Sequence, residues 1–332
     1  MLNKIRAIQV ISFFICIVCG FVVARHFVNK KNIPVVYFTK DLSSNGIIKL
    51  YSKVNDGIEG KVAIKVHTGE RNGPNILPRE WVKDFMSVVP NSTIVETNTW
   101  YKGDRYTTED HRKTLEVNGW TKFTNVDIMD ENGEVPLPIN GGKHFKAIHM
   151  GKNILNYDSM IVLTHFKGHY MGGFGGSIKN IAIGCAGGRI GKAEVHSIPN
   201  GEIAPELKMD DKKLVWKSAF MENMVESAMA TTQHFGKHIT YLNILRNMSV
   251  DCDCAGITAE KPKLADIGVL ASKDIVAIDQ ASIDMVWNAI ESKDSSNKDL
   301  KERINSREGL HQLEYGEIMK LGSRKYKLVE IK

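Results

Sequence analysis

The sequence has few cysteines and no block of like charges. Of its five cysteines, only Cys185, Cys252 and Cys254 lie outside an apolar N-terminal run. Three thiols do not make a disulfide framework, and by themselves they cannot complete a four-cysteine zinc site or iron–sulfur cluster. The net charge is +6, but Lys and Arg are spread along the chain. Nucleic-acid binding is therefore not indicated.

Two common nucleotide-binding patterns are also absent. In the segment 184–193 (GCAGGRIGKA), a P-loop would need glycine where Ala186 stands and Ser or Thr where Ala193 stands. A dinucleotide fingerprint that begins at Gly173 would need glycine in place of Ile178. The chain has no internal repeat and no low-complexity tract. The glycine-rich segments therefore need another explanation.

One long apolar run is present, at residues 7–24, and only Gln9 and Ser12 interrupt it. It approaches the roughly 20 residues that a membrane-spanning helix needs. We expect residues 1–31 to be a membrane anchor or a signal segment. The run is longer than a usual signal-peptide core, which favours an uncleaved anchor over cleaved secretion. The remaining chain, 32–332, is then expected on the extracytoplasmic side of the membrane.

Beyond this run, short apolar strands alternate with amphipathic helices. This rhythm predicts an α/β fold of mostly parallel sheets with flanking helices. We expect two lobes, 32–145 and 146–332, around a central cleft, with loop-like residues 130–145 crossing between them. Strands are predicted at 33–38, 61–67, 92–96, 123–129, 159–163, 239–245, 266–271 and 326–331, and helices at 45–54, 78–86, 107–118, 177–183, 218–233, 277–291 and 307–321.

The stretch 164–196 (THFKGHYMGGFGGSIKNIAIGCAGGRIGKAEVH) contains the clearest site signal. It begins where a buried strand ends, which is the usual place for a ligand in an open α/β sheet. Glycines remove side-chain bulk, and the first N–H groups of the following helix attract anions. Lys179 in the first turn would direct an amine at the ligand. The predicted cofactor-binding residues are Gly172, Gly173, Gly175, Gly176, Ser177, Lys179 and Asn180.

Histidines flank this loop. His165 and His169 have helical i, i+4 spacing, but the glycines argue against a regular helix there, so His169 alone is the better candidate for catalysis or metal binding. His196 could return to the same pocket as a metal ligand, although a surface histidine is an equally good interpretation.

Two further groups of residues are candidates. Cys252 and Cys254, in the sequence DCDC, could bind a metal or take part in redox chemistry if a turn brings them together; the alternative is a structural turn. His67 and Arg105 follow predicted strands on the same sheet edge as His165, as do Glu70 and Asn98, which predicts contacts to a substrate.

Several motifs resemble one known family. They are KVHTGE at 65–70, ETNTWYKGDR at 96–105, HFKGHYMGGFGGSIKN at 165–180, DCDC at 251–254 and DIGVLASKDIVAIDQASIDMV at 266–286. Together they resemble the family called domain of unknown function 362, whose members are often labelled iron–sulfur centre proteins. Many members carry an inserted ferredoxin-like segment with two cysteine runs. Here residues 197–250 contain no cysteine, so this chain lacks a ferredoxin-type cluster motif.

The loop is also similar to that of the nickel-pincer lactate racemase family. That resemblance rests on the spacing of His169 and Lys179. It implies that His169 acts as an acid/base or lies beside a metal, that Lys179 anchors a cofactor, and that His196 ligates the metal. The implied cofactor is a metal ion, nickel or iron, or a nickel-pincer-like nucleotide.

These observations predict a membrane-anchored, metal- or cofactor-dependent enzyme, an oxidoreductase or a racemase-like isomerase. It would transfer a proton, hydride or electron on a small anionic substrate, with His169, Lys179, His67 and Arg105 as catalytic residues. The metal ligands would be His169, His196, Cys252 and Cys254. The alternatives are a non-catalytic metal or iron–sulfur binding module that passes electrons or metal to a membrane or redox partner, and a binding protein for a small anion.

Overall fold

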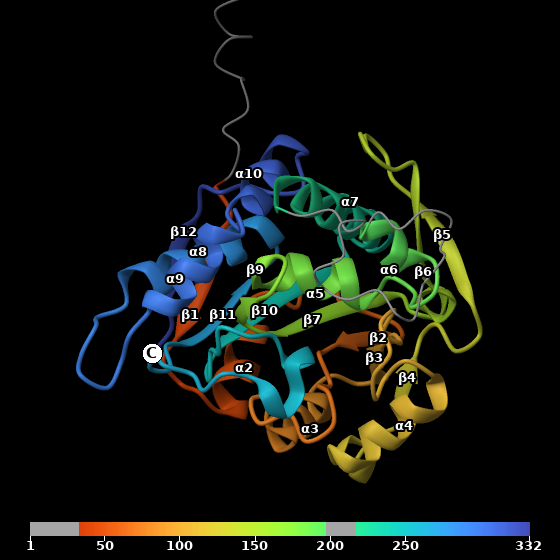
Figure 1. Ribbon diagram of the computed structural model, residues 1–332, viewed down its shortest axis with the longest axis horizontal. Helices are drawn as coiled ribbons and strands as arrows, with labels where there is room; N and C mark the ends of the chain where they lie inside the picture. The colour runs from red at the N-terminus through yellow and green to blue at the C-terminus, as the bar shows by residue number, and fades with distance from the viewer. Residues whose placement is uncertain (1–32, 197–216) are drawn as a thin grey trace, which may run out of the picture. The chain divides into compact units, whose positions relative to one another are not determined.

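The computed structural model describes residues 33–196 and 217–332 (Figure 1). The predicted membrane or signal segment, 1–31, lies outside these residues. Within the two described ranges, no helix is long and apolar enough to cross a membrane. Residues 34–332 form one compact unit.

Eight strands of the described chain form a central sheet in the order β12-β1-β11-β10-β7-β2-β3-β4. The five strands from β10 to β4 run parallel, β11 runs opposite to both of its neighbours, and β12 is parallel to β1. The bounds are β1 Val35–Thr39, β2 Val62–Lys65, β3 Ser92–Glu96, β4 Val126–Ile128, β7 Ser159–His165, β10 Ile239–Leu245, β11 Gly268–Ser272 and β12 Lys327–Glu330.

Helices pack on both faces of this sheet (Figure 1). The α-helices are α2 Ser44–Tyr51, α3 Arg79–Ser87, α4 Thr108–Val117, α5 Ser177–Gly184, α6 Gly191–Val195, α7 Lys217–Phe235, α8 Ile275–Asn288, α9 Lys298–Ser306 and α10 His311–Ile318. Shorter 3-10 turns are η1 Trp120–Lys122, η2 Lys152–Asn156 and η4 Asp253–Thr258.

The alternation of side chains along β7 explains the two layers. Successive residues of a strand point to opposite faces of the sheet. Met160 and Val162 join the hydrophobic core that contains residues of α5, α7 and α8. Ile161 and Leu163 join the core that contains residues of α2 and α3. A continuous apolar strand is therefore buried on both faces, as expected for the middle of a parallel sheet.

The predicted α/β fold, with a mostly parallel sheet and flanking helices, is confirmed. The two lobes, 32–145 and 146–332, are not separate in the structure, because the central sheet takes strands from both ranges. Residues 130–145 are also not only a loop. They contain β5, Glu134–Pro138, which pairs with β6, Ala147–Gly151. Its prolines are tolerated because the strands of a two-stranded sheet are edge strands.

The parallel strands place their carboxyl ends on one edge of the sheet. The segments that follow β2, β3, β7 and β10 all leave from this edge. A hairpin of β8, Lys167–His169, and β9, Gly173–Gly175, follows β7 directly. In an open α/β sheet this edge is where ligands bind.

Candidate functional site

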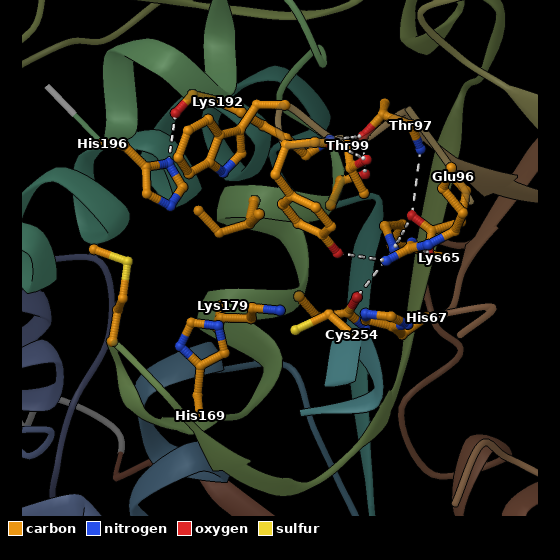
Figure 2. Close-up of a pocket in the computed structure, with 17 residues that line it drawn as sticks. Lys65, His67, Glu96, Thr97, Thr99, His169, Lys179, Lys192, His196 and Cys254 are labelled. Carbon is orange, nitrogen blue, oxygen red and sulfur yellow. Dashed lines mark hydrogen bonds and ion pairs between the residues drawn. The ribbon is translucent and has the colours of Figure 1, made fainter. Parts of the chain in front are cut away.

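A cavity lies at the carboxyl edge of the sheet and encloses about 640 Å³ of empty volume, part of it open to solvent (Figure 2). Its described lining combines charged, imidazole, thiol and apolar groups. The lining residues are Lys65, His67, Glu96, Thr97, Thr99, Trp100, Tyr101, Arg105, His169, Met171, Lys179, Asn180, Ile183, Gly184, Lys192, His196 and Cys254.

Cys252, Cys254 and His169 form the group best suited to hold a metal. One potential ligand atom from each lies within 4.8 Å of the others. The hydrogen bond from Cys254 lowers the pKa of Cys252 well below its ordinary value against the effect of burial, and the charge of Lys179 lowers it further. The hydrogen bond to Cys252 and burial raise the pKa of Cys254 well above its ordinary value. The pair therefore loses its first proton, from Cys252, more easily than its second.

The turn that carries these cysteines is held by buried charges. The carboxylate of Asp253 lies 2.8 Å from Lys167 Nζ and 3.0 Å from His165 Nδ1. The other ring nitrogen of His165 lies 2.8 Å from the carbonyl of Arg246. His165 thus helps to position the cysteine turn through its contact with Asp253, and it does not line the described cavity.

The hydrogen bonds of three histidines assign their neutral tautomers. Nδ1 of His67 accepts from Gly69 N at 3.0 Å, and Nδ1 of His169 accepts from Gly172 N at 2.8 Å. In both rings the hydrogen is therefore on Nε2. Nδ1 of His196 instead lies 2.6 Å from the carbonyl of Lys192 and donates to it, which leaves a lone pair on Nε2.

Burial keeps these rings neutral. It lowers the pKa of His169 to about 3, with the charge of Lys179 contributing. It also lowers the pKa of His196 to about 4, although the hydrogen bond to the Lys192 carbonyl opposes the shift. The pKa of His67 is lowered by burial and by the charge of Arg105. At neutral pH the cavity therefore contains His169 as a hydrogen-bond donor and His196 as an acceptor.

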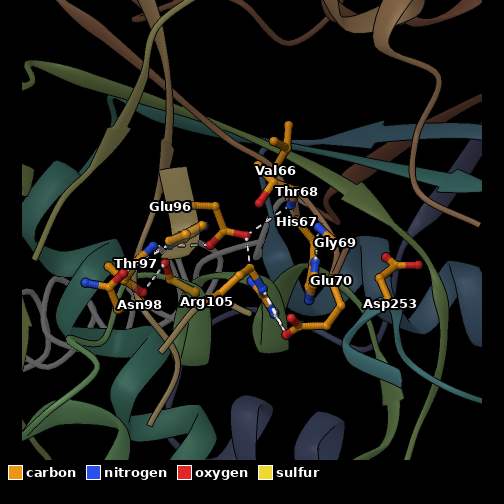
Figure 3. A network of polar contacts seen from close by, with 12 residues as sticks. Val66, His67, Thr68, Gly69, Glu70, Glu96, Thr97, Asn98, Arg105 and Asp253 are labelled. Atoms are coloured by element: carbon orange, nitrogen blue, oxygen red, sulfur yellow. Dashed lines mark hydrogen bonds and ion pairs between the residues drawn. The ribbon is translucent and has the colours of Figure 1, made fainter. Parts of the chain in front are cut away.

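A network of buried ion pairs forms another wall of the cavity (Figure 3). Glu96 Oε2 lies 3.1 Å from Lys65 Nζ, and Glu96 Oε1 lies 3.6 Å from Arg105 Nη1. Arg105 also contacts Glu70 through Nη2 at 2.9 Å and through Nε at 3.0 Å. Although burial raises it, the pKa of Glu96 is held well below its ordinary value by the charges of Lys65 and Arg105. Glu96 and Arg105 in this wall are therefore ionised.

Two further lysines line the cavity and differ in their partners. Lys192 Nζ donates to Thr97 Oγ1 at 2.6 Å, to the Ala186 carbonyl at 3.0 Å and to the Asn98 carbonyl, so its three hydrogens are used. Burial lowers its pKa to about 8. Lys179 Nζ has one polar partner within the described residues, Cys252 Sγ at 3.5 Å. Its side chain is buried and points into the cavity (Figure 2).

The glycine loop does not form the expected anion cradle. The N–H groups of Ser177 and Ile178, at the start of α5, donate to the carboxylate of Asp279 at 2.8 and 2.9 Å. A Cβ on Gly176 would lie 2.4 Å from Asp279 Oδ1. The helix N-terminus is therefore occupied by a side chain of the protein itself.

The structure sorts the predicted site residues into two groups. His67, Arg105, His169, Lys179, Asn180, His196 and Cys254 line the cavity. Gly172, Gly173, Gly175, Gly176 and Ser177, all described, do not line it, and Cys252 lies behind Cys254. His196 is not in the group of three potential metal ligands. Of the neighbouring candidates, Glu70 binds Arg105, and Asn98 contacts Thr108 and His111.

Three charged residues of the cavity were missed: Lys65, Glu96 and Lys192. A signal for Lys65 was present in the sequence. The segment 62–66 reads VAIKV, and a lysine inside a continuous apolar run needs a buried partner. Glu96 ends its strand at the same edge and supplies that partner.

The fold and site define a class of protein: an open, mostly parallel α/β sheet with a thiol- and imidazole-containing cavity at its carboxyl edge. Residues 62–284 match the family described as Domain of unknown function (DUF362). Because this match covers more than half of the chain, the protein belongs to that family, as predicted. All residues of the cavity lie within the matched range.

Solved structures show more distant similarity. The lactate racemase apoprotein from Thermoanaerobacterium thermosaccharolyticum has 13% identity and a TM-score of 0.37, over 63% of this chain and 50% of that one. A Thermotoga maritima protein from a structural genomics programme has 12% identity and a TM-score of 0.35, over 61% and 50%. The chain spans about half the length of these structures. No curated protein matches it.

Proposed function

We propose that this chain is a metal-dependent enzyme that acts on a small anionic ligand at the carboxyl edge of its sheet. The observation that supports this function best is the convergence of His169, Cys252 and Cys254 beside a cavity with several cationic side chains. Membership of the DUF362 family agrees with a metal-associated role but does not identify a reaction.

The donor set fits a soft or borderline metal ion. Thiolate and imidazole ligands suit zinc, nickel and iron. Cys252 already has the lowered pKa that a metal-binding thiolate requires. His169 would have to move its hydrogen from Nε2 to Nδ1 before Nε2 could bind a metal, and Nδ1 would then lose its bond from Gly172. Cys254 would also have to lose its proton, so metal binding is expected to release a proton and to depend on pH.

The cationic and apolar walls support an anionic ligand. Lys179 carries three N–H groups and has one polar partner among the described residues, so it can donate to a bound anion. Arg105 is held in place by Glu70 and Glu96, which compensate its charge, so Lys179 is the cation on which the proposed anion binding rests. Trp100, Met171 and Ile183 offer apolar contact.

His196 supplies a proton-accepting group on the side of the cavity away from His169 (Figure 2). The lone pair on His196 Nε2 can accept a proton from a ligand as general base. A bound metal would supply Lewis-acid polarisation of a ligand oxygen.

Metal analysis of the full chain, purified without oxygen, tests this proposal. We expect a stoichiometric transition metal in the wild type and its loss in Cys252→Ser and Cys254→Ser. Cys185→Ser is the matched control, because Cys185 is buried in the core and burial raises its pKa to about 11. That variant should keep the metal.

Two outcomes would count against the enzyme. A wild-type chain that binds no metal when reduced contradicts the proposed site. Iron together with acid-labile sulfide would instead support the electron-transfer module. The anion part is tested separately, since Lys179→Ala should weaken ligand-induced thermal stabilisation in a screen of small carboxylates and phosphates.

A further inference from the structure

The turn 252–255 brings two thiols together. Ala255 N donates to the carbonyl of Cys252 at 2.8 Å and closes a turn that contains Cys254. The two Sγ atoms lie within 4.8 Å of each other. A disulfide needs sulfurs about 2 Å apart and Cα atoms within about 7 Å, and a tight turn meets the second condition. Rotation of the two side chains would meet the first while Asp253 stays bound to Lys167.

The two cysteines differ in access. Cys254 lines the cavity and is partly exposed, whereas Cys252 is 2% exposed behind it. Lys179 Nζ at 3.5 Å and His67 Nε2 at 3.9 Å surround Cys252 Sγ with positive charge and a hydrogen-bond donor. Such surroundings favour thiolate chemistry. One sulfur can meet a small reagent, and the other is placed to react with the first.

We propose that Cys252 and Cys254 form a thiol–disulfide exchange site for small disulfides, with Cys254 as the attacking residue and Cys252 as the resolving residue. The inference goes beyond the proposed function but uses the same two sulfurs. Oxidation would remove two of the three proposed metal ligands, so metal occupancy would depend on the redox state of the pair.

The exchange balances as two substitutions at sulfur. The proton of Cys254 passes to the adjacent Cys252 Sγ, and the Cys254 thiolate attacks one sulfur of a disulfide RSSR, whose S–S bond breaks and releases one RS⁻. Cys252 passes its proton to this RS⁻, and the Cys252 thiolate then attacks Cys254 Sγ and expels the second sulfur as a thiolate. The two cysteines lose two electrons in forming one S–S bond, and RSSR gains them.

Glutathione disulfide is the probe for this site. The full chain is purified without oxygen, stripped of metal with a chelator and then treated with the probe. We expect an intact mass lower by two hydrogen atoms, a Cys252–Cys254 link in the peptide map, and loss of metal binding. Mapping separates this pair from Cys16 and Cys19.

The single variants identify the order of attack. Cys252→Ser should stop at a mixed disulfide and gain one glutathione group on Cys254. Cys254→Ser should be labelled at Cys252 at least about tenfold more slowly, because that sulfur is buried. Cys185→Ser should behave like the wild type.

Native protein that keeps both thiols, under conditions that oxidise the urea-unfolded chain, would overturn the exchange site. Equal labelling of the two single variants would overturn the assigned roles. Metal binding is measured separately on reduced protein. Absence of metal with normal disulfide formation counts only against the proposed enzyme, and metal binding without disulfide formation counts only against the exchange site.

Discussion

Lys179 is the cation that compensates the negative charge of the cysteine pair. Its Nζ lies 3.5 Å from Cys252 Sγ in a buried setting, where an ion pair is screened less than at the surface. The same interaction acts on the lysine. Although burial lowers it, the pKa of Lys179 is raised above its ordinary value by the charge of Cys252. Each group therefore favours the ionised form of the other.

Removal of this cation should therefore raise the pKa of Cys252. We expect Lys179→Gln to hold less thiolate at neutral pH than the wild type, because the nearest positive charge is gone. Ultraviolet absorbance of the thiolate across a pH titration measures this, with Cys185→Ser as the background in both proteins. Lys102→Gln, which removes an exposed lysine, is the control. Identical titrations for Lys179→Gln and wild type would contradict the role of Lys179.

Several residues of the cavity could be predicted from the sequence alone. His67, Arg105, His169, Lys179 and Cys254 were predicted and do line one cavity, because strand-end position and residue type both point to the same sheet edge. The tautomers of the three cavity histidines could not be predicted. Whether a ring accepts from a backbone N–H or donates to a carbonyl depends on loop conformation, which residue type does not determine.

The start of helix α5 shows why a correct element can have an incorrect role. The helix was expected at 177–183 and is found at Ser177–Gly184. Its free N–H groups were expected to bind an anionic ligand, but Asp279 of α8 supplies the anion. A glycine needed for close approach of a ligand and one needed for close approach of a carboxylate look the same in a sequence. Gly168 likewise allows a close approach within the protein itself, because a Cβ added there would lie 2.0 Å from the carbonyl oxygen of Val250.

Because Asp279 caps helix α5, we expect the free energy of unfolding to depend on pH. Burial raises the pKa of Asp279 to about 6, compared with about 4 for an unfolded aspartate. The folded carboxyl group therefore keeps its proton to a higher pH than the unfolded one does. Its contribution to the free energy of unfolding is fully present below about pH 4 and is lost as the pH rises through about 6.

We expect Asp279→Asn to lower the free energy of unfolding by about 1–3 kcal/mol, because the amide NH₂ would face a backbone N–H that it cannot accept from. The difference from wild type should be larger near pH 4 than near pH 7. Urea unfolding at both pH values measures it. Asp294→Asn, at an exposed carboxylate, should change little at either pH. A difference that grows towards pH 7 would show that the cap titrates in the opposite sense.

At the scale of the whole molecule, residues 34–332 form one compact unit. Both hydrophobic cores lie within that unit. The unit joins strands from both halves of the chain, which local patterns could not predict, because β10 pairs with β7 and β1 pairs with β11 across long separations in sequence. Periodicity identifies strands but not their neighbours.

The position of these cores predicts the effect of deleting residues 1–31. Since every core residue of the described chain lies within 34–332, we expect the free energy of unfolding of the compact unit to change by less than about 1 kcal/mol. We also expect the protein to move from the membrane fraction to the soluble fraction, because the apolar run of 7–24 is the proposed anchor. Full-length protein that is already soluble and uncleaved would contradict the anchor.

A reporter fused after Lys332 tests on which side of the membrane the cavity lies. A reporter that is active only outside the cytoplasm would place the cavity where small disulfides persist, the compartment in which the Cys252–Cys254 pair could be oxidised.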